Sequence, residues 1–291
     1  MAAGVLRAAR PMLGALSLPL PLLLDGRQRR AGGGPVRNEG LDSKTFVQLR
    51  CLRNELHTHD TRKVTLQLPA GEAKWTAQAP ISNVMVGTFV QKEGEEKPKR
   101  LAKPYNPLSV EEPGSLTLLV KKYEGARVGG KLHELQVGQS IEVKGGFQQW
   151  TFESDKYSHY AMVAGGTGIT PLLQALAFIL EHDQLAKVTL LTANKTPQDV
   201  LLYEELSALQ KAHPTRLTIH HHIDSAAGSQ VTAEVLRRAL PPAAPRVLVM
   251  VCGPMGMVKA VAGPKAKDFT QGEVSGFLKE LGYSEVHVWK V

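Results

Sequence analysis

The stretch Tyr160–Leu173, which reads YAMVAGGTGITPLL, decides the fold class of the chain. Its first residues carry no charge and predict a buried strand, which glycines at 165, 166 and 168 then interrupt. An apolar helical pattern follows, with Thr170 placed to cap the helix and Pro171 at the first helical position, where a missing N–H costs nothing. A strand, a glycine turn and a helix N-terminus together favour an anion, because the backbone approaches a phosphate closely and free N–H groups face it.

This glycine turn differs from the two common nucleotide-binding motifs. Pro171 stands where a G-x-G-x-x-G motif has its third glycine, and the Lys-Ser/Thr end of a Walker A loop is missing. Taken alone, the stretch therefore leaves an ordinary tight turn of an α/β sheet as the alternative.

The rest of the chain after residue 159 alternates between strand and helix patterns. Strands are expected at 160–164, 188–192, 217–223, 247–252 and 286–289, and helices at 171–182, 201–213, 231–240 and 272–282. This alternation predicts a parallel sheet with crossover helices in a domain at 159–291.

The part before residue 153 consists mainly of short β-type segments. They lie at 45–51, 63–68, 83–91, 115–122 and 140–144, with one short helix candidate at 130–135. Several short strands separated by polar or glycine-proline stretches predict an antiparallel β-barrel at 42–153. The predicted fold class is thus a two-domain β plus α/β protein.

The composition is that of a globular protein with a modest basic excess. Hydrophobic residues make up 43% and charged residues 21%, and the formal net charge is +8. The first 40 residues hold six arginines against Asp25 and Glu39, which accounts for +4 and leaves +4 for the rest. That excess favours an acidic protein partner, whereas the absence of a nucleic-acid motif argues against nucleic acid.

Residues 1–40 are typical of a targeting segment followed by a glycine-rich linker. The first acidic residue is Asp25, and the apolar run Met12–Leu24 is short for a membrane span of about 20 residues. Arginines recur at 27, 29 and 30 before any folded pattern begins, which favours a mitochondrial location over a secretory signal. Whether the segment is cleaved or anchors the protein to a mitochondrial membrane stays open.

The stretch Lys103–Pro107, KPYNP, places an aromatic ring beside an amide. Pro104 and Pro107 hold Tyr105 and Asn106 in an extended geometry. A ring with a neighbouring amide suits a planar heterocycle, and the cation of Lys103 suits a phosphate. The alternative is a proline-stiffened strand edge with an exposed tyrosine.

Three further positions carry chemistry. The glycine pair of Gly129–His133, GGKLH, precedes the short helix candidate and forms a second potential anion site, or else a hairpin loop. Cys252 ends an apolar strand, either as a buried small hydrophobic residue or facing a cofactor. Asp224 ends another strand, where a carboxylate accepts a ribose hydrogen bond and repels a 2′-phosphate, unless it is only a turn residue.

The run His220–His222 does not predict a metal site. Alternate residues of a strand face opposite ways, so at most His220 and His222 share a face. No cysteine or carboxylate stands at ligand spacing from them, so we expect no metal. Cys51 and Cys252 are the two cysteines, and they lie too far apart in sequence to indicate a disulfide framework.

Taken in order, the motifs KPYNP, VKKY, GGK, AGGTGITP, NKTPQD, CGP and QGEV resemble those of the NADH-cytochrome b5 reductases, and most of all their mitochondrial branch. The resemblance runs from about Lys44 to Val291. It implies an FAD-binding β-barrel followed by an NADH-binding α/β domain. It also implies hydride transfer from NADH to flavin N5, followed by single-electron transfer to cytochrome b5 or a similar acidic haem protein.

The resemblance also implies roles for individual residues. Lys103 would face the FAD pyrophosphate, Tyr105 would lie against the flavin ring and Asn106 near N5. The residues that we expect to act in catalysis are Tyr105, Asn106, Lys121 and Cys252. With Asp224 added, the expected cofactor-binding residues are Lys103, Pro104, Tyr105, Asn106, Val120, Lys121, Tyr123, Gly129, Gly130, Lys131, Leu132, His133, Gly166, Thr167, Gly168, Thr170, Pro171, Asp224, Cys252, Gly253 and Pro254.

Four departures from the family pattern motivate alternatives. The family usually has arginine at Lys103, serine or threonine at His133, proline at Met255 and a terminal phenylalanine where the chain ends in Val291. Lysine keeps the charge at position 103 but lacks the bidentate fork of arginine. The alternatives are the same fold with another electron acceptor, and a flavin- or nucleotide-binding protein with little turnover.

Overall fold

The computed structural model describes residues 41, 43–69, 80–91, 96–108, 114–224, 230–268 and 270–291, which belong to one compact unit. The expected targeting segment and linker at 1–40 lie outside the described residues. No helix in the described part is both long and apolar enough to span a bilayer.

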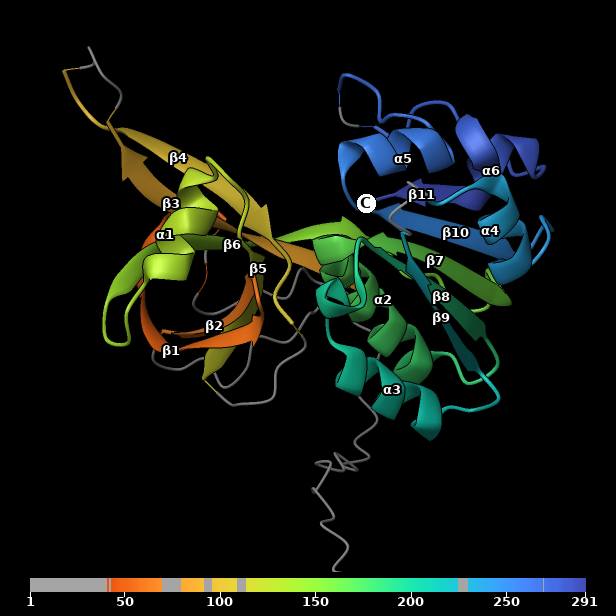
Figure 1. Ribbon diagram of the computed structural model, residues 1–291, viewed down its shortest axis with the longest axis horizontal. Helices are drawn as coiled ribbons and strands as arrows, with labels where there is room; N and C mark the ends of the chain where they lie inside the picture. The colour runs from red at the N-terminus through yellow and green to blue at the C-terminus, as the bar shows by residue number, and fades with distance from the viewer. Residues whose placement is uncertain are drawn as a thin grey trace, which may run out of the picture. The chain divides into compact units, whose positions relative to one another are not determined.

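The first half of the described chain folds into an antiparallel sheet of six strands in the order β4-β3-β6-β1-β2-β5. The strands are β1 (Val47–Thr58), β2 (Thr61–Gln67), β3 (Ile81–Val90), β4 (Lys99–Tyr105), β5 (Ser115–Lys121) and β6 (Ser140–Trp150), with helix α1 (Arg127–Glu134) between the last two. After β4, Leu108 forms a bridge to Thr117 of β5, which brings the two edges of the sheet together. The predicted antiparallel barrel is confirmed (Figure 1).

The barrel is filled by alternate residues of its strands. Val64 and Leu66 of β2 are fully buried, as are Leu116 and Leu118 of β5, and Val120 is 1% exposed. A period of two places these side chains on the inner face of the sheet. Removing them from water supplies the main stabilisation of this half.

The second half contains a parallel sheet in the order β11-β10-β7-β8-β9. Its strands are β7 (His159–Gly165), β8 (Lys187–Asn194), β9 (Leu217–Ile223), β10 (Val247–Cys252) and β11 (Val288–Lys290). Its helices are α2 (Ile169–His182), α3 (Tyr203–Ala212), α4 (Ala233–Ala239), α5 (Met255–Ala262) and α6 (Gly276–Glu280), with short 3-10 turns η1 (Gly166–Gly168), η2 (Pro197–Asp199) and η3 (Glu285–His287). Helices α2 and α3 cover one face of the sheet, and α4, α5 and α6 cover the other (Figure 1). The predicted parallel sheet with crossover helices is confirmed.

The strand order reverses direction at β7. The chain adds β8 and β9 on one side of β7 and then returns to place β10 and β11 on the other. Ligands of open α/β sheets bind where such a reversal leaves a crevice at the carboxyl ends of the strands. This rule directs attention to the turns that follow β7 and β10.

The start of α2 differs from the sequence prediction. The η1 turn continues directly into the helix, which begins at Ile169 with Gly168 as its N-cap and no side-chain cap. Thr170 is therefore already inside the first turn, and its hydroxyl donates to the carbonyl of Thr167 at 3.1 Å. The prediction that Thr170 caps the helix is wrong. Pro171 lies in the same first turn, where the N–H groups have no helical partner.

Other element boundaries differ as well. Helix α1 begins at Arg127, so Gly129 and Gly130 lie within the helix and do not precede it. Helix α5 follows Pro254 directly, in a stretch where the sequence predicts no helix. The helix predicted at 272–282 covers only Gly276–Glu280, because the φ values of +63° at Gly272 and +67° at Gly276 lie outside the right-handed helical region and stop the helix from extending N-terminal to Gly276.

Candidate functional site

Two adjoining cavities lie at the carboxyl ends of β7 and β10. The first has a volume of about 400 Å³ and the second about 780 Å³. They share Lys121, Tyr123 and Pro254 as lining residues. The site is thus one continuous depression at the reversal of strand order, where the topology places a ligand.

The first cavity collects most of the residues predicted for the flavin and the nicotinamide. It takes residues from the end of β4, from β5, from α1, from the turn after β7 and from the turn after β10. Its lining includes the predicted residues Pro104, Tyr105, Asn106, Lys121, Tyr123, Gly129, Thr167, Gly168, Thr170, Pro171, Cys252, Gly253 and Pro254. The second cavity includes Gly166 and Asp224.

The remaining predicted residues are not among the described residues that line either cavity. Val120 and Leu132 are buried in the barrel core, and Lys131 is exposed on α1. Lys103 is exposed on β4, so its contact with the FAD pyrophosphate stays a prediction. Gly130 and His133 are the other two predicted residues that are not among the described residues lining either cavity.

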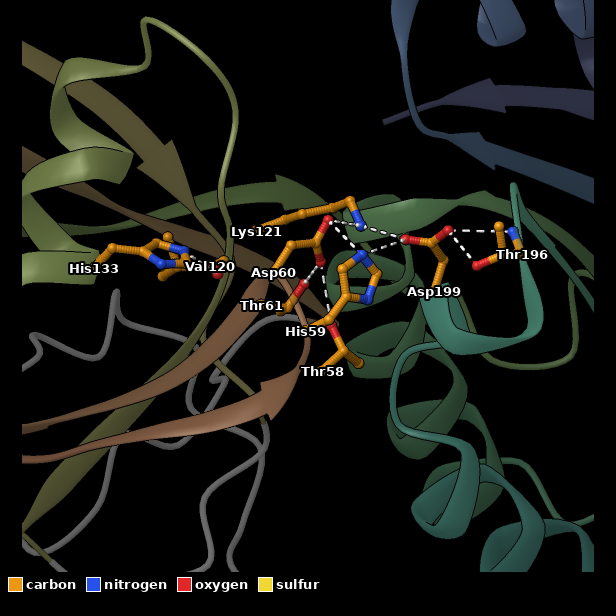
Figure 2. Close-up of polar contacts among 9 residues, drawn as sticks. All are labelled: Thr58, His59, Asp60, Thr61, Val120, Lys121, His133, Thr196 and Asp199. Carbon is orange, nitrogen blue, oxygen red and sulfur yellow. Dashed lines mark hydrogen bonds and ion pairs between the residues drawn. The ribbon is translucent and has the colours of Figure 1, made fainter.

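His133 faces the backbone of β5, as Figure 2 shows. Its Nε2 lies 2.8 Å from the carbonyl oxygen of Val120, to which the ring donates. Burial lowers the pKa of His133 despite this bond, which favours the neutral ring. The imidazole therefore ties α1 to β5, at a position where the resemblance implied a cofactor-binding residue.

The two turns of the parallel sheet touch at Gly168. A Cβ atom at this position would lie 2.3 Å from the carbonyl oxygen of Cys252 and 2.7 Å from the nitrogen of Gly253. Real Cβ atoms do not approach backbone so closely, so the turn after β7 needs glycine here. The contact closes one wall of the first cavity.

Tyr105 forms the opposite wall. A Cβ atom at Gly129 would lie 3.6 Å from the Tyr105 hydroxyl oxygen, an ordinary van der Waals distance, so the phenol lies beside α1 at Gly129. Burial raises the pKa of Tyr105 to about 12. The phenol is therefore neutral at physiological pH and available as a hydrogen-bond donor.

Cys252 ends β10 and lines the first cavity, so of the two roles considered for it, the one facing a ligand agrees with its position. Burial raises the pKa of its thiol to about 11. The thiol is therefore protonated at physiological pH and acts as a small, weakly polar wall residue and not as a nucleophile.

Lys121 is held between two carboxylates, as Figure 2 shows. Its Nζ lies 2.6 Å from Asp60 Oδ2 and 2.8 Å from Asp199 Oδ1. Burial alone would lower the pKa of Lys121, but both carboxylates outweigh it and raise the pKa. Burial would likewise raise the pKa of each carboxyl, but hydrogen bonds from Lys121 hold both below their ordinary range. All three groups are therefore charged, with a net charge of −1.

The comparisons with known proteins identify the family. The family model of the oxidoreductase FAD-binding domain matches residues 48–152, and that of the oxidoreductase NAD-binding domain matches residues 162–263. NADH-cytochrome b5 reductase 2 of Pyricularia oryzae is 38% identical over 85% of this chain and 76% of its own length. The chain belongs to the NADH-cytochrome b5 reductase family.

Two further relatives agree with this assignment. NADH-cytochrome b5 reductase 2 of Candida albicans is 30% identical over 96% of this chain and 94% of the relative. The cytochrome b5 reductase domain of Ulva prolifera nitrate reductase superposes with a TM-score of 0.71 at 25% identity, covering 86% of this chain and 98% of the other. The predicted family is confirmed, and so are FAD and NAD as the cofactors of the two domains.

The residues that line the second cavity fit a nicotinamide dinucleotide. The Oδ1 atom of Asp224 is buried in the second cavity without a hydrogen-bond partner among the described residues, with His222 Nε2 at 3.5 Å. An unpartnered acceptor of this kind suits a ribose hydroxyl. Gly166 has a φ of +49° and open space where a Cβ would point, so the backbone lies open to a ligand there.

Sequence reasoning missed the acidic partners of Lys121. Asp60 lies in the short turn between β1 and β2, which was read only as a polar break between two strands. Asp199 belongs to the NKTPQD motif, where it also accepts from Thr196 in a capping box. Both residues line the second cavity, as do His59 and Lys195. The sequence signal that could have revealed Asp199 is its place at the acidic end of the NKTPQD motif, directly after the buried strand β8.

The FAD-binding half also contacts the NAD-binding half through His57. Its Nε2 accepts a hydrogen bond from the backbone N–H of Leu202 at 3.0 Å, and Leu202 has a φ of +58°. Burial, followed by the charge of Lys63, lowers the pKa of His57, while Glu205 opposes them. The neutral ring that can accept this bond is therefore the favoured form.

This contact predicts a pH dependence of stability. His57 contributes stability above about pH 6.5, the ordinary histidine pKa, and loses it as pH falls through its lower folded-state pKa. Losing the bond costs about 1 kcal/mol, or about 2–4 °C in melting temperature for a chain of this size. Between pH 7 and pH 5, the melting temperature of the parent should fall by about 2–4 °C more than that of His57→Gln, because the glutamine amide oxygen accepts the hydrogen bond without titrating. Parallel melting curves for the two proteins would contradict the assignment.

Proposed function

We propose that this protein transfers electrons from NADH, through bound FAD, to cytochrome b5. The observation that carries the proposal is the first cavity, where Tyr105 and Lys121 of the FAD-binding domain meet Thr167 and Cys252 of the NAD-binding domain. The relatives' names supply the acceptor: the curated reductases of P. oryzae and C. albicans are both named for cytochrome b5.

In this mechanism the cofactors do the redox chemistry and the protein orients them. Bound FAD would supply the capacity to take a hydride from NADH and to pass electrons on singly. Tyr105 holds one wall of the cavity, and the backbone of Gly168 and Gly253 forms the other, closely packed wall. Where the two cavities join, Lys121 offsets part of the negative charge of Asp60 and Asp199. No general base is required by such a reaction.

The acceptor is tested by steady-state oxidation of NADH with purified cytochrome b5, with ferricyanide as the small-molecule control. The proposal predicts saturable reduction of cytochrome b5. Reduction of ferricyanide but not of cytochrome b5 would favour the alternative of another acceptor. Bound FAD without oxidation of NADH by either route would favour a binding protein with little turnover.

Asp224 predicts a preference for NADH over NADPH. Two unit charges 4 Å apart repel by about 4 kcal/mol at an effective dielectric near 20. A third of that repulsion between Asp224 and a 2′-phosphate already gives about a tenfold preference for NADH in kcat/KM. The exposed Lys195 lines the same cavity, and its positive charge reduces this preference by attracting the 2′-phosphate. Asp224→Ser should narrow the preference mainly by improving the use of NADPH. Kinetics with both nucleotides check this, with exposed Asp268→Ser as the control. An unchanged preference in Asp224→Ser would assign selectivity to another residue.

We also propose a mitochondrial location, with residues 1–40 directing it. The support is the arginine-rich, acid-poor start of the chain, which contains six arginines and two acidic residues in its first 40 positions. The same segment is proposed either to be cleaved or to associate with a mitochondrial membrane. A reporter fused to residues 1–40 should enter or coat mitochondria, and a cytosolic or secreted reporter would remove the basis for this proposal.

A further inference from the structure

Gln174 is a buried polar side chain that the mechanism above leaves without a role. It lies on α2, where it is only 3% exposed and is surrounded in sequence by the buried residues Leu172, Leu173, Ala175 and Leu176. An amide taken out of water destabilises the fold unless its hydrogen bonds are satisfied. Its partners therefore show what the residue does.

Among the described residues, every hydrogen-bond partner of the Gln174 side chain belongs to the FAD-binding domain. The Gln174 Nε2 donates to the carbonyl of Pro107 at 2.8 Å, and its Oε1 accepts from the backbone N–H of Ser82 at 3.1 Å. Asn106 Nδ2 lies 3.4 Å from the same Oε1 and donates to the Ser82 carbonyl and to Gln149 Oε1, each at 2.8 Å. One side chain of α2 thus holds both β3 and the segment that follows β4.

The two ends of this connection are the two walls of the first cavity. Gln174 follows Thr170 by four residues, so the two lie one turn apart on the same side of α2. Thr170 and Pro171 line the nicotinamide side of the cavity, while Tyr105 and Asn106 line the flavin side. A displacement of α2 relative to the Asn106 segment would therefore change the width of the cavity.

We propose that Gln174 is a positioning residue that sets the separation between the flavin side and the nicotinamide side of the site. This inference rests on the function proposed above. Hydride transfer needs the reacting atoms about 3–3.5 Å apart, and a misplacement of 1 Å can reduce the rate about 100-fold. A buried amide between the two walls is suited to hold such a distance, because each of its two polar atoms has a backbone partner.

The test compares Gln174→Met with a matched control beside it. Methionine keeps the length and volume of the side chain and loses every hydrogen bond. Ser82→Ala is the control, because Ser82 Oγ is buried without a hydrogen-bond partner among the described residues, so its removal breaks no contact of the network. Three quantities are measured on the FAD-loaded proteins: the rate of flavin reduction at saturating NADH, the KM for NADH, and amide hydrogen exchange at Ser82.

For Gln174→Met we expect a rate of flavin reduction at least about tenfold lower, a KM for NADH within about twofold of the parent, retained FAD and faster exchange at Ser82. Ser82→Ala should match the parent in all kinetic quantities. A reduction rate within about twofold of the parent, together with faster exchange at Ser82, would overturn the proposal, because the bond would then be lost without any effect on the chemistry.

A second variant covers a failure of Gln174→Met to fold. Gln174→Glu keeps the shape and an acceptor for the Ser82 N–H, and at a pH high enough to ionise the buried carboxyl it cannot donate to Pro107. We expect a fall in reduction rate of at least about threefold without a rise in KM, and an unchanged rate would overturn the proposal. If NADH does not reduce the parent, the proposed function itself fails. If the parent is reduced and both variants match it, only the role of Gln174 fails.

Discussion

Gly168→Ala is expected to lower kcat/KM for NADH at least about 100-fold. The new Cβ would lie 2.3 Å from the carbonyl oxygen of Cys252 and 2.5 Å from its carbonyl carbon. Both atoms are backbone at the end of β10, so no side-chain rotation relieves the clash, and one of the two turns must move. Those turns form a wall of the first cavity, and overpacking of this kind also costs about 1–3 kcal/mol of stability.

Gly138→Ala separates this effect from simple destabilisation. Gly138 lies between α1 and β6 with a φ of +91°, and it is not among the described residues that line either cavity. Alanine there is strained by about 1–2 kcal/mol. We expect a lower melting temperature but near-parental kinetics for Gly138→Ala, and loss of both for Gly168→Ala. Parental turnover in Gly168→Ala would show that the close approach of the two turns does not shape the site.

Lys121→Ala is expected to weaken NADH binding at least about tenfold. The substitution leaves Asp60 and Asp199 without the cation that lies within 2.8 Å of both. The local charge then changes from −1 to −2 in a cavity that would take an anionic dinucleotide, and 1.4 kcal/mol of lost attraction already gives tenfold. Equilibrium binding of NAD⁺ to the FAD-loaded protein measures this directly, because no turnover takes place.

Two comparisons isolate the charge at Lys121. The double variant Lys121→Ala with Asp199→Asn removes one of the two carboxylate charges left without Lys121 and should recover part of the affinity. Lys156→Ala removes a lysine whose partner, Glu153, lies on the surface, and it should bind NAD⁺ like the parent. Unchanged binding in Lys121→Ala would show that the Lys121, Asp60 and Asp199 cluster does not face the nucleotide.

The fold could be predicted because its signals are local. The uncharged run at 160–164 becomes β7, and the glycine turn after it leads into α2. Alternation of strands and helices predicts a parallel sheet. Few topologies remain for it, because crossover connections between parallel strands are right-handed. The barrel could be predicted in the same way from short strands whose alternate residues are buried.

The details at the ends of elements could not be predicted as well, because they depend on backbone angles. Threonine is a residue type preferred at helix N-caps, but the η1 turn leads into the helix at Ile169, one residue before Thr170. Gly276 was read as part of a longer helix, although its φ of +67° marks the point where the helix begins. Neither feature changes the pattern of apolar residues from which the helices were predicted.

The contacts that make the site depend on segments far apart in sequence. Gly168 meets Cys252 and Lys121 meets Asp199 only after the sheet has formed, so spacing alone cannot reveal either pair. Gln174 did leave a signal: it is a polar residue at a buried position of an apolar helix. A residue of that kind needs hydrogen-bond partners, and here they belong to the other domain.

Anaerobic titration with NADH tests the central claim most directly. The purified FAD-loaded protein should be yellow, and one equivalent of NADH per flavin should bleach it completely. Mixing the bleached protein with oxidised cytochrome b5 should restore the colour while two equivalents of cytochrome are reduced, because a hydride carries two electrons and each haem takes one. A flavin that NADH leaves oxidised, or a bleached protein that cytochrome b5 does not reoxidise, would contradict the account.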